Sequence, residues 1–166
     1  MSELTNIGNE QIQELLHQVM DPEIPVLSVV DLGIIRDVQV TDHIIVTITP
    51  TYSGCPAMNT IEEDIVSCLK DEGYHNVEVK TVLSPAWTTD WISQEGRNAL
   101  EKYGIAPPLD ADADKDALLG NKKIVKCTNC GSQNTKLVSQ FGSTACKAQF
   151  QCDDCQEPFD YFKCLK

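Results

Sequence analysis

The sequence predicts an α+β protein: a small α/β sandwich followed by a small C-terminal domain that binds metal through cysteines. Two observations predict this fold class. In the first part of the chain, stretches with apolar residues at helical spacing alternate with short β-branched stretches. Near the end of the chain, two Cys-x-x-Cys pairs occur at 127–130 and 152–155. Mixed helices and strands of this kind pack as layers around one core.

The N-terminal part is expected to contain three helices and three strands. Apolar residues between positions 10 and 20 share one side of a helix, which should end near Pro22 because proline disfavours helical geometry in the residue before it. The next two stretches predict an antiparallel hairpin, and a second helix follows Pro56. In chain order, helices are expected at 10–20, 56–73 and 93–103, and strands at 34–40, 43–49 and 76–83.

The chain is expected to divide into an α+β domain at residues 1–105, an acidic linker at 106–121 and a ribbon domain at 122–166. The linker begins with prolines and continues with alternating aspartates, a composition that favours an extended spacer. These aspartates lack the glycine and the glutamate that a calcium loop carries at its sixth and twelfth positions. We therefore interpret the segment as a spacer.

The two cysteine pairs, Cys127–Cys130 and Cys152–Cys155, have the spacing of a four-thiolate metal site. Each pair can present two sulfurs on one tight turn, and the intervening hairpin can bring the turns together. Gly131 suits the sharp turn after the first pair, where φ is often positive. A disulfide framework is the alternative, but this spacing is more typical of metal binding. The sequence therefore predicts a C-terminal zinc ribbon whose metal is structural.

The net charge of −12 is unevenly distributed. Residues 1–117 carry 6 basic and 21 acidic side chains, whereas residues 118–166 carry 7 basic and 4 acidic ones. An acidic body argues against nucleic acid as a partner, because affinity for phosphate chains depends on lysine and arginine. The sequence also lacks an apolar stretch of membrane-spanning length and a signal peptide, so we expect no membrane association and a cytoplasmic protein with reduced thiols.

Cys55 is the most informative single residue of the N-terminal part, because it lies in a loop at the start of the second helix. The helix dipole and unpaired N–H groups favour a thiolate there, so we expect a pKa below that of a free thiol. A reactive or metal-contacting thiol and a buried, inert one both stay open. Asp21, Glu23 and Asp31 lie in a proline-containing loop. Either this is a rigid loop in which Asp21 or Asp31 caps a neighbouring element, or the three side chains supply oxygen ligands or hydrogen-bond acceptors to a shared pocket.

Two further thiols, Cys146 and Cys164, accompany the four ribbon cysteines. They can pack as small apolar residues on the ribbon strands. Alternatively, they form a second thiol site, or the ribbon holds an iron–sulfur cluster in place of zinc. Iron in a four-cysteine site would use the same turns, so the spacing does not separate these metals.

Longer motifs add a resemblance to known families. Residues 21–25, Asp-Pro-Glu-Ile-Pro, and 51–56, Thr-Tyr-Ser-Gly-Cys-Pro, resemble the SufT-type family of iron–sulfur assembly proteins. Residues 84–91, Ser-Pro-Ala-Trp-Thr-Thr-Asp-Trp, and the cysteine-containing stretch 141–164 are similar to the PaaD family of bacterial phenylacetate-degradation proteins. The resemblance covers most of the chain from Asp21 to Cys164. It implies a SufT-type α/β sandwich followed by a zinc ribbon.

The PaaD resemblance implies a maturation factor for the iron–sulfur or di-iron centres of the monooxygenase that epoxidises the ring of phenylacetyl-CoA. It implies that Cys55 holds iron or a nascent cluster transiently, with Asp21, Glu23 and Asp31 as oxygen ligands or as charges that tune the thiolate. The implied partners are the oxygenase and reductase subunits of that system, and a homodimer is a further candidate. A non-catalytic structural subunit or adaptor is the alternative. The chain has neither a glycine-rich dinucleotide fingerprint nor apolar helices long enough for a di-iron bundle, so it is not expected to perform the epoxidation itself.

Overall fold

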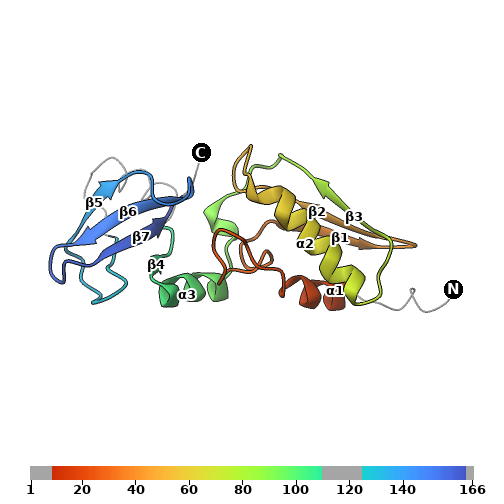
Figure 1. The fold of residues 1–166 in the computed structure, drawn as a ribbon, viewed down its shortest axis with the longest axis horizontal. Helices are drawn as coiled ribbons and strands as arrows, with labels where there is room; N and C mark the ends of the chain where they lie inside the picture. Colours follow the sequence, from red (N-terminus) through yellow and green to blue (C-terminus); the bar gives the residue numbers. More distant parts are fainter. Residues whose placement is uncertain (1–8, 110–124, 164–166) are drawn as a thin grey trace. The chain divides into compact units, whose positions relative to one another are not determined.

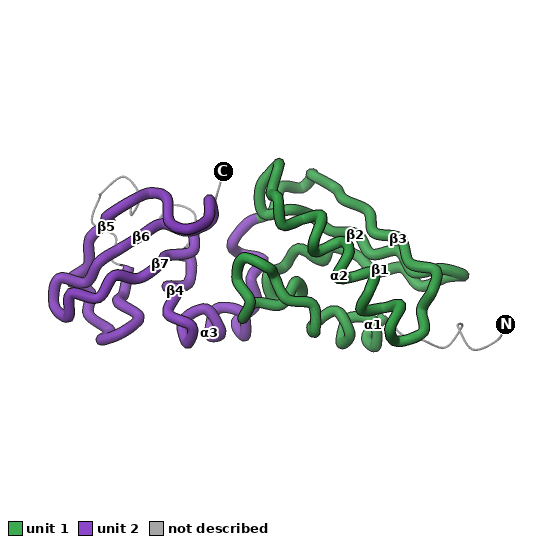
Figure 2. The backbone as a smooth tube through the Cα atoms, viewed as in Figure 1, with its two compact units in different colours: residues 1–87 green, residues 88–166 purple. Residues whose placement is uncertain are grey.

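The computed structural model describes residues 9–109 and 125–163. Contacts divide the chain into two compact units, residues 1–87 and 88–166, each with helical and β-strand parts (Figure 2). The expected boundary at residue 105 falls inside the second unit. Most of the expected linker, from residue 110 onward, lies outside the described residues.

Unit 1 is an α/β layer built on a three-stranded sheet (Figure 1). Strands β1 and β2 form the expected antiparallel hairpin, and β3 pairs with β2 in parallel after the chain crosses over through helix α2. Strand β2 therefore lies at the centre of the sheet, and β1 and β3 are its edges. The elements are α1 (Asn9–Leu16), β1 (Ile35–Val40), β2 (Ile44–Ile48), α2 (Ala57–Asp71) and β3 (Val77–Thr81).

The core of unit 1 follows from the sequence periodicities. Alternate residues of β2 are buried, as expected for a strand with one face toward a helix. Helix α2 contributes a buried stripe at three- and four-residue spacing, which includes Ile61, Ile65 and Leu69. Trp87 is the last residue of this unit. Its ring is buried, and its Nε1–H donates a hydrogen bond to the carbonyl oxygen of Leu32 at 2.9 Å. Trp87 therefore packs as a core residue of this unit.

Helix α1 ends four residues earlier than the periodicity predicts. After Leu16 the chain turns, and the Val29 N–H donates to the carbonyl oxygen of Val19 at 2.9 Å. The Asp21 N–H likewise donates to the carbonyl oxygen of Leu27 at 2.9 Å. The N–H groups of Gln18 and Val19 donate to carbonyl oxygens only three residues back, so the α-helical pattern is not continued and the chain pairs across the loop instead.

Unit 2 contains the cysteine ribbon and the last helix. Helix α3 begins after Ser93, whose Oγ accepts a hydrogen bond from the Gly96 N–H at 3.0 Å, and ends before Gly104, as the sequence predicts. It leads directly into β4, which pairs in parallel with β7. The sheet order is β4-β7-β6-β5. The elements are η2 (Thr89–Trp91), α3 (Gln94–Tyr103), β4 (Ile105–Ala106), β5 (Thr135–Ser139), β6 (Lys147–Cys152) and β7 (Pro158–Phe162).

The ribbon core is small and centred on three aromatic rings. Phe150 stacks on Phe159 with a centroid distance of 6.0 Å and meets the edge of Tyr161 at 5.5 Å. Cys127 and Cys152 are buried against the same cluster, so the core extends to the cysteine turns. A domain this small buries little apolar surface, and a bound metal is a common additional source of stability. Among the described residues, no helix combines the length and the apolar character needed to span a membrane.

Candidate metal centre

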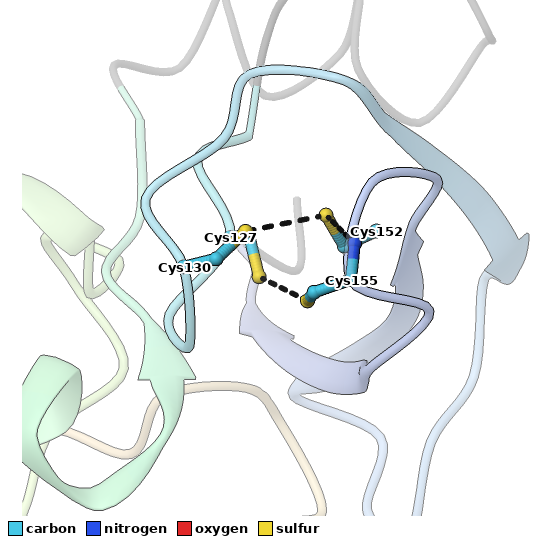
Figure 3. A group of neighbouring side chains, drawn as sticks. All are labelled: Cys127, Cys130, Cys152 and Cys155. Carbon is cyan, nitrogen blue, oxygen red and sulfur yellow. Dashed lines mark hydrogen bonds between the residues drawn. The ribbon is translucent and has the colours of Figure 1, made fainter.

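The four ribbon cysteines converge on one point, with each pair carried by its own turn (Figure 3). Their Sγ atoms all lie within 4.8 Å of one another. The Sγ atoms of Cys127 and Cys155 are 3.8 Å apart, and those of Cys130 and Cys152 are 3.6 Å apart. Zn–S bonds of about 2.3 Å in a tetrahedron place the sulfurs about 3.8 Å apart. The sulfurs are also too far apart for disulfides, which require about 2.05 Å. The donor set therefore fits one tetrahedral metal ion.

The two cysteine turns are built alike, although their sequences differ. The Cys127 N–H donates to the carbonyl oxygen of Ser132 at 2.9 Å, and the Cys152 N–H donates to the carbonyl oxygen of Glu157 at 3.0 Å. The residue just after each pair takes a positive φ: +74° at Gly131 and +65° at the equivalent residue of the second turn, which is glutamine. The positive φ expected at Gly131 is confirmed.

Backbone and amide N–H groups surround the sulfurs. The Asn129 backbone N–H donates to Cys127 Sγ at 3.4 Å, and the Asn129 Nδ2 donates to Cys155 Sγ at 3.6 Å. The Cys155 N–H donates to Cys152 Sγ at 3.5 Å. Such donors stabilise thiolate charge and orient the sulfurs before a metal arrives.

These donors act unequally on Cys155 and Cys130. The backbone N–H of Glu157 and then the side chain of Asn129 lower the pKa of Cys155 to about 7. At Cys130 the backbone N–H of Ser132 lowers the pKa, but desolvation and hydrogen bonds with the neighbouring thiols together raise it to about 12. Cys155 therefore loses its proton more readily than Cys130, whose thiolate needs a nearby cation to compensate its charge.

Polar side chains also join the two turns, and the sequence analysis did not identify them. Asp154 accepts hydrogen bonds from Ser132 Oγ and from Asn134 Nδ2, the latter at 3.1 Å. Lys136 of β5 forms an ion pair of 2.8 Å with Asp153 of the second turn. The only signal available in the sequence was that Asp153 and Asp154 occupy both variable positions of the second Cys-x-x-Cys pair.

The Cys55 loop lies in unit 1 between β2 and α2. The Cys55 thiol is partly buried, and this burial raises its pKa. The Ala57 backbone N–H and the side chains of Tyr52 and Thr51 oppose that shift, whereas the negative charge of Glu23 reinforces it. The expected lowering of the pKa is therefore wrong. The helix contributes its N–H group as expected, but desolvation outweighs that contribution.

The three acidic residues of the preceding loop occupy different surroundings. Asp21 is buried, and its Oδ1 accepts hydrogen bonds from the backbone N–H groups of Glu23 and Ile24 at 2.7 and 2.9 Å. Asp31 Oδ2 accepts a hydrogen bond from Ser28 Oγ at 2.9 Å and lies 3.7 Å from Nδ1 of His17. Glu23 is the acidic residue whose charge acts on the thiol.

The structure therefore brings Glu23 and Cys55 into electrostatic contact and gives Asp21 and Asp31 loop-capping hydrogen bonds. Among the described residues, the four ribbon cysteines form the one group of three or more candidate ligand atoms close enough to share an ion. Metal contact at Cys55, Asp21, Glu23 and Asp31 stays a prediction.

Of the two additional thiols, Cys146 is not part of the four-sulfur group. Cys146 is buried just before β6, and its Sγ lies 3.1 Å from Thr144 Oγ1. Cys164 lies outside the described residues. A second thiol site formed by this pair stays a prediction.

Comparison with known proteins agrees with the division into two units. Residues 9–81 match the model of a family described as "Iron-sulfur cluster assembly protein", and residues 111–163 match "PaaD zinc beta ribbon domain". Over 99% of its length, the chain is 46% identical to the whole of an Escherichia coli (strain K12) protein, which is named as one subunit of a "Putative 1,2-phenylacetyl-CoA epoxidase". This chain belongs to the PaaD family.

The N-terminal part of this PaaD-family chain also has relatives of its own. It is 38% identical to 84% of a Porphyromonas gingivalis protein named "Fe-S protein maturation auxiliary factor", over 52% of the chain. It also resembles the crystal structure of a domain of unknown function, DUF59, from Bacillus anthracis. That match has a TM-score of 0.51 and 28% identity, and it covers 55% of this chain and 89% of the other. The expected α+β fold with a SufT-type domain and a four-cysteine ribbon is therefore confirmed.

Proposed function

We propose that this chain is a maturation factor for the metal centres of a phenylacetyl-CoA epoxidase, with iron–sulfur or di-iron centres as its products. The observation that carries the proposal is full-length similarity to a protein named as an epoxidase subunit, in a chain that begins with an iron–sulfur assembly domain. Its partners in this proposal are the oxygenase and reductase subunits, in the cytoplasm, where thiols stay reduced. The chain itself carries out no epoxidation.

The two thiol sites have different tasks in this proposal. Cys127, Cys130, Cys152 and Cys155 hold a structural zinc ion, because four thiolates close the coordination sphere and leave no position for a substrate. Cys55 binds iron or a nascent cluster as cargo. A single partly exposed thiol beside one carboxylate supplies too few ligands for permanent binding, and partner ligands can therefore displace it.

A structural adaptor is the second candidate function. The ribbon exposes two large apolar side chains, Phe141 at 66% and Val138 at 55%. Exposed aromatic and aliphatic groups are typical of surfaces that bind another protein. In this case the ribbon would join epoxidase subunits, and Cys55 would be dispensable.

Anaerobic reconstitution separates the two functions. The full chain, its Cys55→Ser variant and a Cys68→Ser control are titrated with ferrous iron and sulfide, followed by visible absorption and iron analysis. Cys68 is a suitable control because it is also a partly buried thiol of unit 1, and its Sγ donates to the Leu15 carbonyl oxygen at 3.4 Å.

A maturation factor requires that Cys55→Ser loses the iron-dependent absorption and no longer supports formation of active epoxidase in cells, while Cys68→Ser retains both. Equal iron uptake and equal epoxidase activity in all three proteins would exclude the role of Cys55. The adaptor function would then be the better explanation if deletion of the ribbon still abolished co-purification with epoxidase subunits.

A further inference from the structure

Strand β3 leaves one edge of the unit 1 sheet open. The sheet order is β1-β2-β3, and no other strand of the described residues pairs with the outer side of β3 (Figure 1). An unpaired edge presents N–H and C=O groups that can bind a further strand. The question is which strand this edge fits.

The hydrogen bonds to β2 establish which backbone groups face outward. The Ile44 N–H donates to the carbonyl oxygen of Asn76, and the Val82 N–H donates to that of Ile48, both at 2.9 Å. Backbone groups alternate in direction along a strand, so even-numbered residues from 76 to 82 face β2. The N–H and C=O groups of Val77, Val79 and Thr81 therefore face outward.

The side chains of β3 make this edge complementary to itself. The strand reads Val-Glu-Val-Lys-Thr from residue 77 to residue 81, with Val79 at its centre. When two copies pair antiparallel with Val79 opposite Val79, the outward-facing groups of both copies meet. The same register places Glu78 of each copy opposite Lys80 of the other.

Alternative registers are less favourable. A shift of two residues in either direction retains backbone hydrogen bonds but places Glu78 opposite Glu78, or Lys80 opposite Lys80. A shift of one residue places outward-facing groups opposite inward-facing ones, so hydrogen bonds are lost. Opposite charges directly across a strand pair are stabilising and like charges are destabilising, so a single register is selected.

Apolar groups beside the edge support the same arrangement. Val79 and Val66 form the apolar part of a shallow groove that is also lined by Glu62, Glu63 and Ser67 of α2, and the second copy's Val79 would cover that apolar part. Val82 and Leu83, which continue the chain after β3, are 36% and 64% exposed. We propose that β3 is a self-association edge at which two copies of this chain form one continuous six-stranded sheet through antiparallel β3–β3 pairing centred on Val79.

The test uses charge reversal in the full, metal-loaded chain under reducing conditions, with sedimentation equilibrium to measure mass and dimer dissociation constant. We expect the wild-type chain to reach twice its mass of 18.4 kDa. Glu78→Lys and Lys80→Glu each create two repulsive pairs per dimer and should weaken dimerisation about ten-fold, or about 1.4 kcal/mol. The double variant exchanges both charges, recreates the complementary pattern and should restore wild-type affinity.

Two controls separate this edge from general charge and folding effects. Glu101→Lys makes the same charge change on an exposed position of α3 and should leave the dissociation constant unchanged. Circular dichroism verifies that each variant is folded, and Val79→Pro provides a second disruption, since it removes an outward N–H that β2 does not use. A monomeric wild-type chain, or a dimer that Glu78→Lys, Lys80→Glu and Val79→Pro leave intact, would overturn the proposal.

Discussion

The ribbon site and the Cys55 loop both present thiols from short turns, but only one of them is a complete coordination site. In the ribbon, four sulfurs from two turns lie within 4.8 Å of one another, and equivalent backbone hydrogen bonds close both turns. In the loop, a single thiol has a carboxylate neighbour, and the nearby aspartates are engaged with backbone or hydroxyl groups. Four convergent sulfurs complete a tetrahedral coordination sphere, whereas one thiol beside one carboxylate does not.

The two sites also differ in the pKa values of their thiols. Cys155 receives N–H donors that lower its pKa to about 7, in a group where a metal ion would compensate the thiolate charges. Cys55 has one backbone N–H donor, but burial and the charge of Glu23 raise its pKa. The ribbon therefore contains a thiol that ionises near neutral pH, whereas the Cys55 thiol stays protonated there.

The largest expected difference is in stability after loss of a thiol. Cys152→Ser removes a fully buried ligand, and we expect it to abolish stoichiometric metal binding and unfold the ribbon. Structural zinc supplies roughly 10–16 kcal/mol of apparent free energy in small domains, more than a domain of this size can lose. Metal analysis and amide NMR signals of the β6 residues measure both effects.

Cys55→Ser is the matched control, and it should retain the metal and the β6 signals. Cys146→Ser should also retain the metal, because Cys146 Sγ is not among the four convergent sulfurs. If Cys146→Ser loses the metal, the ribbon site uses more than four sulfurs. If Cys152→Ser keeps it, the four-thiolate assignment is wrong.

The sequence predicted the ribbon site more completely than the loop, and the reason is physical. A Cys-x-x-Cys turn is a local structure, so the ligands Cys127 and Cys152 can be assigned from spacing alone. The pKa of Cys55 depends on how much of the thiol is desolvated, which is a property of packing between distant segments. The local sequence predicts that the helix dipole lowers the pKa of Cys55, but it does not show the burial that raises this pKa by more. Likewise, periodicity did not show that loop pairing ends α1 at Leu16.

A second difference should appear in thiol reactivity. Because its pKa is raised, Cys55 should react with iodoacetamide more slowly near neutral pH than the same cysteine in the unfolded chain, and its rate should rise as the pH approaches and exceeds 9. Glu23→Gln removes a negative charge that disfavours the thiolate, so the pKa falls and the rate at neutral pH increases by roughly three-fold. Peptide-level mass spectrometry follows Cys55 separately from other thiols.

Asp31→Asn is the matched control for this experiment, because it also removes one negative charge from the same loop, whereas Glu23 is the acidic residue whose charge raises the pKa of Cys55. It should leave the alkylation rate unchanged. Equal acceleration by both variants would show a general charge effect. An unchanged rate in Glu23→Gln would show that the charge of Glu23 does not act on the Cys55 thiol.

The smallest expected difference concerns the turns themselves, each of which contains a glycine with positive φ. Gly131 has φ of +74° in the first ribbon turn, and Gly54 has φ of +81° beside Cys55. Alanine at either position carries a left-handed backbone strain of about 1–2 kcal/mol. A Cβ at Gly131 would come 3.4 Å from the Lys126 side chain, and one at Gly54 would meet nothing within 4 Å, so neither substitution adds a clash.

The two substitutions should therefore cost similar free energy but differ in what they affect. Gly131→Ala strains the turn that holds Cys127 and Cys130, so metal affinity should fall by about five- to thirty-fold, as that strain energy implies. Gly54→Ala should leave metal affinity unchanged and lower only the unfolding midpoint of unit 1. Competition with a colorimetric chelator measures the first effect, and thermal unfolding of the metal-loaded chain measures the second. Equal loss of metal affinity in both variants would contradict the separation between a closed ribbon site and an open loop site.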